Sequence, residues 1–119
     1  MKIFKVLNTL ASSKEEQVSY LIAIGTFPST DELAIEFDDE YKILLGILND
    51  KKNSFLNSHL NFLNKLNEID SIFAEMNHAN VKIFWDAASL GSEKWNKIRE
   101  RAKDALNYSK ISDIMNLLV

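Results

Sequence analysis

Cysteine is absent from this chain of 119 residues, so it can form neither a disulfide bond nor a cysteine-ligated zinc site. Proline occurs once and glycine three times. So few turn-forming residues favour helices joined by short loops over a β protein with many turns. The three glycines are also isolated from one another in the sequence, which excludes a glycine-rich phosphate-binding loop.

Long hydrophobic runs are missing as well. The longest one, around YLIAIGTF, is far shorter than the roughly twenty residues that a membrane-spanning helix needs. Near the N-terminus, Asn8 and Thr9 interrupt the apolar residues that follow Lys2 and Lys5, well before a signal-peptide core would be complete. Together with the lack of cysteine, these features predict a soluble, cytoplasmic protein that does not associate with a membrane.

A positive excess, which nucleic-acid binding would favour, is also lacking, because the net charge is −3. Residues 1–60 hold nine acids and six lysines, whereas residues 61–119 hold eight charges of each sign. Six of the acids fall between Asp31 and Glu40, with no Lys or Arg among them. The acidity of the chain is therefore concentrated in one short stretch.

Hydrophobic periodicity predicts an all-α fold. We expect one domain over residues 1–119, with five or six helices in a bundle-like arrangement. The helices predicted to form its core are 14–24, 30–48, 54–76 and 93–107. A last short helix is expected after Ser112, with Ile114, Met115 and Leu118 facing the core. Residues 1–12 fit either a helix or a short strand, and residues 81–85 fit an extended segment.

The helix over residues 14–24 has distinct signals at both ends. Ser12 and Ser13 each lie three residues before a glutamate, so either serine can begin a capping box. Gly25 can take the left-handed conformation that commonly ends a helix. The buried side is predicted to consist of Val18, Leu21 and Ile22.

The helix over residues 30–48 begins after Pro28, with Ser29 and Glu32 spaced as a second capping box. Asp31 and Glu32 then occupy the first turn, where the helix dipole favours negative charge. A break at Asp38 and Asp39 is an alternative, because aspartate is unfavourable inside a helix. The predicted apolar face is Leu33, Phe37, Tyr41, Leu44 and Leu48.

Two later helices have equally regular apolar positions. In the helix over residues 54–76, which has a possible break at Asp70 and Ser71, these positions are Leu56, Leu60, Leu63, Leu66, Ile69, Phe73 and Met76. Asp86 can cap a short turn that ends at Gly91, and Ser92 can then start the helix over residues 93–107. The inward residues of that helix are predicted to be Trp95, Ile98, Ala102 and Leu106.

No catalytic or metal-binding motif in the sequence is complete. Glu75 and His78 form an E-x-x-H pair, but a di-iron bundle requires two such pairs and two further glutamates. The other histidine, His59, has Leu56 where its glutamate would stand. Serine, histidine and aspartate occur without a G-x-S-x-G motif. We therefore predict no enzyme activity, no metal and no cofactor, and keep a carboxylate-based enzyme or metal protein as an alternative.

The segment EKWNKIRERAKDAL is basic and contains a tryptophan, Trp95, that could stack on a nucleic-acid base. Trp95 shares an apolar face with Ile98 and Ala102, however, so its burial is the simpler interpretation. The negative net charge also opposes phosphate binding. Direct binding of nucleic acid is therefore not predicted.

The acidic stretch is interpreted as a surface for a basic protein partner. Glu36, Asp39 and Glu40 are not needed to start the helix. They are expected to repel one another, with no feature of the sequence that offsets this repulsion. Complementary charge speeds association and selects partners. The predicted partner-binding residues are Glu32, Glu36, Asp38, Asp39, Glu40 and Tyr41.

The stretch YLIAIGTFPSTDELAIEFDDEY, followed by FW and by W-x-x-I-R-x-x-A-x-x-A-L, resembles a small helical family of bacterial immunity proteins. These proteins belong to contact-dependent growth inhibition and related polymorphic toxin systems. The resemblance covers about residues 18 to 106. It implies that the chain binds and blocks a cognate toxin domain, often a basic nuclease, without turnover. A small adaptor or regulatory protein with another basic partner is the alternative.

Overall fold

The computed structural model describes residues 1–51, 58–79 and 85–118. Within these ranges the chain forms six α-helices, one 3₁₀-helix and no strand, which confirms the predicted all-α fold class. The helices are α1 (Ile3–Ala11), α2 (Lys14–Ile24), α3 (Asp31–Lys51), α5 (Leu60–His78), η2 (Ala87–Gly91), α6 (Glu93–Leu106) and α7 (Ile111–Leu118). None of these helices has the length and apolar character needed to cross a membrane.

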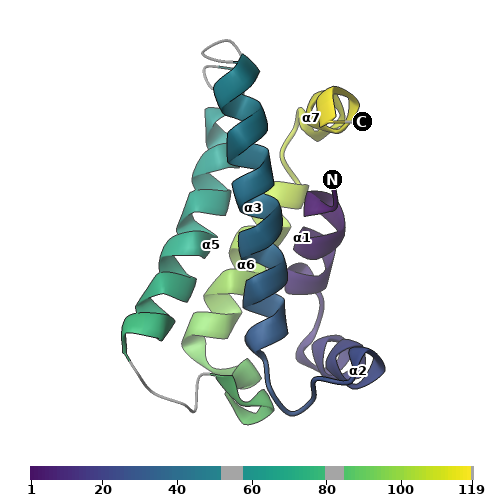
Figure 1. The fold of residues 1–119 in the computed structure, drawn as a ribbon, viewed down its shortest axis with the longest axis vertical. Helices are drawn as coiled ribbons and strands as arrows, with labels where there is room; N and C mark the ends of the chain where they lie inside the picture. Colours follow the sequence, from purple (N-terminus) through teal and green to yellow (C-terminus); the bar gives the residue numbers. More distant parts are fainter. Residues whose placement is uncertain (52–57, 80–84, 119) are drawn as a thin grey trace.

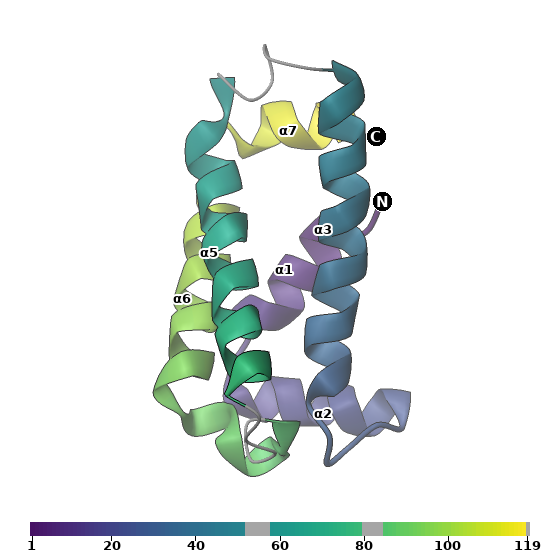
Figure 2. The same cartoon turned by 60° about the vertical axis from the view of Figure 1, so that its left-hand side comes forward.

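The long helices α3, α5 and α6 stand upright, and the short helix α1 lies among them (Figure 1). α1 packs most extensively against α6 and α3, and α5 packs against α6. By contrast, α3 and α5 touch each other little, although they run upright side by side (Figure 2). α2 crosses the lower end of the molecule and α7 crosses the upper end (Figure 2).

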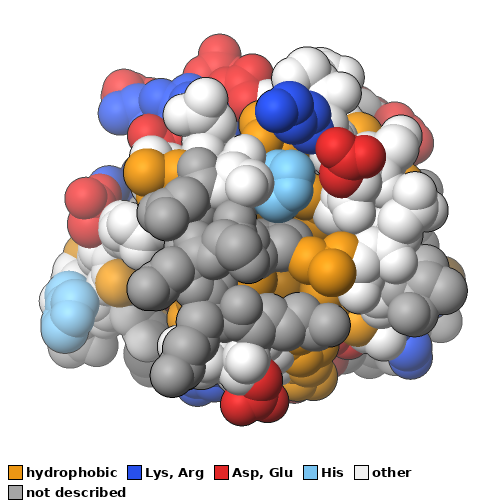
Figure 3. Space-filling view, turned by 90° about the horizontal axis from the view of Figure 1, so that it is seen from above, with side chains coloured by type: hydrophobic (Ala, Val, Ile, Leu, Met, Phe, Trp, Pro, Cys, Tyr) orange, Lys and Arg blue, Asp and Glu red, His pale blue; other side chains and the backbone are white. Residues whose placement is uncertain are grey.

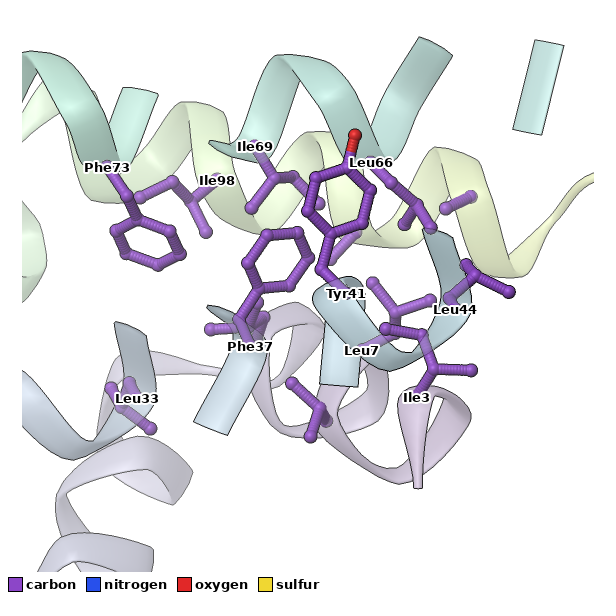
Figure 4. Close-up of a cluster of buried hydrophobic side chains, with 14 of the residues drawn as sticks. Ile3, Leu7, Leu33, Phe37, Tyr41, Leu44, Leu66, Ile69, Phe73 and Ile98 are labelled. Carbon is purple, nitrogen blue, oxygen red and sulfur yellow. The ribbon is translucent and has the colours of Figure 1, made fainter. Parts of the chain in front are cut away.

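One hydrophobic core joins these helices (Figure 4). The N-terminal segment is a helix, because Ile3, Val6, Leu7 and Leu10 are buried at helical spacing. On α3 the predicted apolar face is confirmed: all five of its residues are buried. Seen from the upper end, the charged side chains of the described residues lie mainly toward the edge of the face, and hydrophobic side chains show at several places between them (Figure 3).

Both long helices are continuous where the sequence allowed a break. α3 runs through Asp38 and Asp39, and Lys42 forms an ion pair with Asp38 at 2.7 Å. α5 runs through Asp70 and Ser71. In both helices the buried apolar residues continue past these positions, so burial outweighs the unfavourable propensity of the polar residues.

The helix ends largely follow their sequence signals. Ser13 and Glu16 form the capping box of α2, and Gly25 ends that helix with a φ of 80°. Asp86 caps η2 by accepting a hydrogen bond from the Ala88 amide. The capping box predicted for Ser29 and Glu32 is wrong, because the Ser29 hydroxyl accepts a hydrogen bond from the Asp31 amide instead.

Several predicted buried positions prove to be exposed. Ile22 is 58% exposed, and Leu60 and Met115 also face solvent. Ile22 and Leu60 lie near the ends of their helices, and Met115 lies in the short terminal helix α7, where few other elements can cover them. Leu106 and Leu118 are partly buried. The predictions for residues 81–84, and for Leu56 at the start of the 54–76 helix, lie outside the described residues.

The inner side of α2, where Ile22 was expected, is occupied by a cluster of buried polar side chains. Gln17 is completely buried and donates hydrogen bonds to the carbonyl groups of Thr9 and Leu10. Its side-chain oxygen accepts a hydrogen bond from Arg99 of α6 at 2.7 Å. Arg99 is also buried and donates to the Leu90 carbonyl of η2. This cluster therefore ties α1, α2, η2 and α6 together.

We predict that Arg99→Met lowers the free energy of unfolding by about 3 kcal/mol, because Gln17 and the Leu90 carbonyl lose a charged donor while the apolar stem is kept. Urea denaturation followed by circular dichroism measures this change. Lys103→Met is the control, since Lys103 lies exposed on the same helix. Equal effects of the two substitutions would contradict a structural role for Arg99.

Candidate functional site

The acidic stretch of α3 is divided between two sides of the helix. Glu36, Asp39 and Glu40 lie toward α1 and α2, where they line a small hollow of about 180 Å³. Asp31 and Asp38 lie toward α5, where they line a larger groove. Residues that are close together in the sequence therefore belong to two different surfaces, because successive helix positions are rotated by about 100°.

On the α1 side, two of the three acids have structural partners. Glu36 accepts hydrogen bonds from the Tyr20 hydroxyl at 2.5 and 2.8 Å. Glu40 accepts a hydrogen bond from the backbone amide of Lys2 at 3.1 Å. Lys2 and Lys5 line the same hollow and balance part of its negative charge. The expectation that nothing offsets the repulsion among these acids is therefore wrong for Glu36 and Glu40.

The Tyr20–Glu36 contact also changes the acidity of the phenol. Partial burial, the hydrogen bond to Glu36 and the nearby negative charges of Glu36 and Glu32 together raise the pKa of Tyr20 to about 12. Each of these causes disfavours the negatively charged phenolate form of Tyr20. Glu32 therefore contributes to the electrostatics of this side of α3, whereas Asp39 is exposed.

Tyr41 lies in the core, and its ring stacks on Phe37 with the ring centroids 5.3 Å apart. In Figure 4 its hydroxyl group points away from the α3 backbone, toward α5. Burial, followed by the negative charge of Asp70, raises the pKa of Tyr41. Its packing explains its place on the apolar face, and its predicted contact with a partner stays a prediction.

A groove of about 540 Å³ runs between the lower halves of α3 and α5. Each helix has four lining residues at helical positions i, i+3, i+4 and i+7, which form one continuous face, and Phe37 of α3 also lines the groove. From α3 these residues are Asp31, Ala34, Ile35 and Asp38. From α5 they are Asp70, Phe73, Ala74 and Asn77. The groove has room because the middle of each face carries an alanine.

Aromatic rings form the floor of the groove. Phe73 lies between Phe37 and Trp85, with ring-centroid distances of 5.8 Å and 6.4 Å. Trp85 is held in place by its backbone, because its carbonyl accepts a hydrogen bond from the Thr30 amide at 3.0 Å. Two residues further along each segment, beyond the antiparallel Ser29–Asp86 bridge, the Ala87 amide donates a hydrogen bond to the Pro28 carbonyl at 2.8 Å. The floor is therefore fixed to the start of α3.

Three aspartates surround this aromatic floor: Asp31, Asp38 and Asp70. Partial burial raises the pKa of Asp70, and the negative charge of Asp38 raises it further, while Lys42 lowers it. Lys42 pairs with Asp38, but its side chain is 72% exposed, so this pair is weak. A cationic group placed in the groove would therefore relieve an unfavourable arrangement of negative charges.

Two other polar candidates from the sequence, Glu75 and Arg101, have local partners. Glu75 forms an ion pair with Lys94 at 2.8 Å, and this contact lowers the pKa of Glu75. Arg101 of the basic helix contacts Glu68 at 2.9 Å. No group of three or more His, Cys, Asp or Glu side chains within the described ranges is placed to hold a metal ion.

Comparison with known proteins adds no relative: no family model, curated protein or solved structure matches this chain. The assignment of the groove as a candidate site is therefore based on the geometry of this structure alone. Sequence reasoning assigned Asp38 to a binding surface but missed Asp70 and Trp85. The sequence does carry a signal for this groove. The patterns D-x-x-A-I-x-x-D at residues 31–38 and D-x-x-F-A-x-x-N at residues 70–77 each place an alanine between two polar residues on one helix face.

We predict that the Tyr20–Glu36 hydrogen bond stabilises the fold by about 1 kcal/mol. The phenol pKa is higher in the folded state than in the unfolded state, so this contribution is complete below pH 10 and is lost as the pH rises toward about 12. A double-mutant cycle with Tyr20→Phe and Glu36→Gln, measured by urea denaturation at neutral pH and near pH 11, tests both statements. A coupling energy that is zero at neutral pH would contradict them.

Proposed function

We propose that this protein binds a basic protein domain and blocks it by direct contact, as an immunity protein does with a bacterial toxin. The observation that supports this proposal best is the groove between α3 and α5, in which three aspartates surround an aromatic floor. The proposal requires no turnover and no cofactor. The cognate toxin domain is its expected partner.

The composition of the groove suits a protein partner. Aromatic side chains are frequent at the energetic centres of protein interfaces, because they offer a large contact area at low entropic cost. Here Trp85 is partly exposed at the floor, and Ile35, which also lines the groove, is 49% exposed. Burying these side chains against a partner would contribute favourable hydrophobic free energy.

The charge of the groove favours a basic partner. Domains that act on nucleic acid carry positive patches, since they bind phosphates. A negative groove would attract such a patch and speed the encounter. The hollow on the α1 side is less suitable, because Lys2 and Lys5 lie beside its acids. We therefore assign the main contact to Asp31, Asp38 and Asp70, with Asp39 and the α1-side acids at the edge.

We predict that a toxin domain is encoded beside this gene, and that cells survive its expression when this protein is co-expressed with it. The purified proteins should form a complex of defined stoichiometry in size-exclusion chromatography, and protection should require at least that molar ratio, since an inhibitor is used up by binding. The complex should weaken as the salt concentration rises, because its charges are screened.

The control is an unrelated basic protein of similar charge, such as a lysozyme, which should not form the complex. Protection at a small fraction of the toxin concentration would indicate turnover and contradict the proposal. Absence of both protection and complex formation would also contradict it.

A further inference from the structure

We infer that the groove between α3 and α5 binds an amphipathic helix of the partner. On this helix, two basic residues about two turns apart flank an apolar side chain that inserts into the groove. This inference rests on the proposed function, because it specifies which part of the basic partner is bound. It follows from the shape of the groove, its floor and the positions of its three acids.

The shape of the groove fits a helix. α3 and α5 run in opposite directions, and each presents a face of four residues over about two turns. Ala34 and Ala74 lie in the middle of these faces. Helices pack at axis distances of about 8–10 Å, and small side chains allow the closest approach. A third helix can therefore lie along the two alanines, as in other helix-in-groove complexes.

The acids determine the spacing of the partner's charges. On α3, Asp31 and Asp38 stand at the two ends of the face, about 10 Å apart along the helix axis. Because the helices are antiparallel, Asp70 lies at the same end as Asp38, and its charge is sensitive to that of Asp38. A guanidinium group at this end can contact both carboxylates. A second basic residue, seven positions away on the partner helix, can then reach Asp31.

Between these two ends lies the aromatic floor. Phe73 is buried, whereas Trp85 and Ile35 are partly or largely exposed. An apolar partner side chain located three or four residues from each basic residue would cover this floor. The weak Lys42–Asp38 pair can be displaced, since Lys42 is largely exposed.

A helix-stabilised synthetic peptide tests the inference without the natural partner. It carries two arginines seven positions apart, with two leucines between them, on one face. We expect titration of the ¹⁵N-labelled protein to shift the backbone amides of Ala34, Asp38 and Ala74 and the indole of Trp85. A peptide with glutamates in place of the arginines should not bind, because it would face three aspartates.

Two variants of the protein locate the contact. Replacing Asp31, Asp38 and Asp70 with Asn should weaken peptide binding by about tenfold or more. The matched control replaces Asp50, Asp104 and Asp113 with Asn; it removes the same charge from exposed positions that do not line the groove, and should change the affinity by less than about threefold. Ala74→Leu should fill the groove and abolish binding while the melting temperature is kept, since Ala74 is exposed.

Equal weakening by both triple variants, or binding that survives Ala74→Leu, would overturn the inference. Arginine amide that binds as tightly as the peptide would also overturn it, because the site would then recognise a small cation and not a helix. The proposed function is tested separately. Protection of cells that is unaffected by Ala74→Leu would leave the function standing and refute the groove, whereas peptide binding without protection would do the reverse.

Discussion

The insertion of α1 between α3 and α6 determines the arrangement of the other helices. α1 is only nine residues long, yet four of its side chains are buried: Ile3, Val6, Leu7 and Leu10. Burying a large aliphatic side chain contributes about 1.5–3 kcal/mol, so this short helix can hold two long ones. α3 is then attached to the molecule through α1, while α5 is attached through α6. Because α3 and α5 contact each other far less than they contact α1 and α6, respectively, their facing sides leave room for the groove.

Backbone and buried polar contacts fix the lower end of this arrangement. The Thr30–Trp85 hydrogen bond joins the start of α3 to the segment that carries the groove floor. Arg99 joins α6 to Gln17 of α2 and to η2, which follows Trp85 in the chain. The segment that carries the groove floor is therefore attached on one side to the start of α3 and on the other, through η2, to α6 and α2. Such a site loses little conformational freedom on binding, which favours affinity.

Much of the fold could be predicted from local patterns. The ends of α2, the buried face of α3 and the cap of η2 follow from residue spacing and cap chemistry, both of which act within one or two turns. The buried pair Gln17 and Arg99 could not be predicted in this way, because its residues are 82 positions apart. Periodicity predicted that Ile22 is buried, because the spacing of apolar residues gives no sign that the polar side chain of Gln17 occupies the inner side of α2.

The candidate site was predicted only in part, for a related reason. The acidic stretch was recognised, but a linear stretch of charge does not show how a helix distributes it between two surfaces. The partners of Glu36 and Glu40 come from α2 and from the N-terminus, and Asp70 comes from another helix. Which two helices face each other across a gap depends on the packing of α1, which no single segment of sequence specifies.

The central claim is that the partner occupies the groove between α3 and α5. Since the chain has no cysteine, a single fluorescent label can be attached at Asn77→Cys, in the groove, or at Glu100→Cys, on the exposed side of α6. We predict that the toxin domain shifts the emission of the label at position 77 to shorter wavelength and shields it from iodide quenching, while the label at position 100 is unaffected. Shielding of position 100 without any change at position 77 would contradict the account.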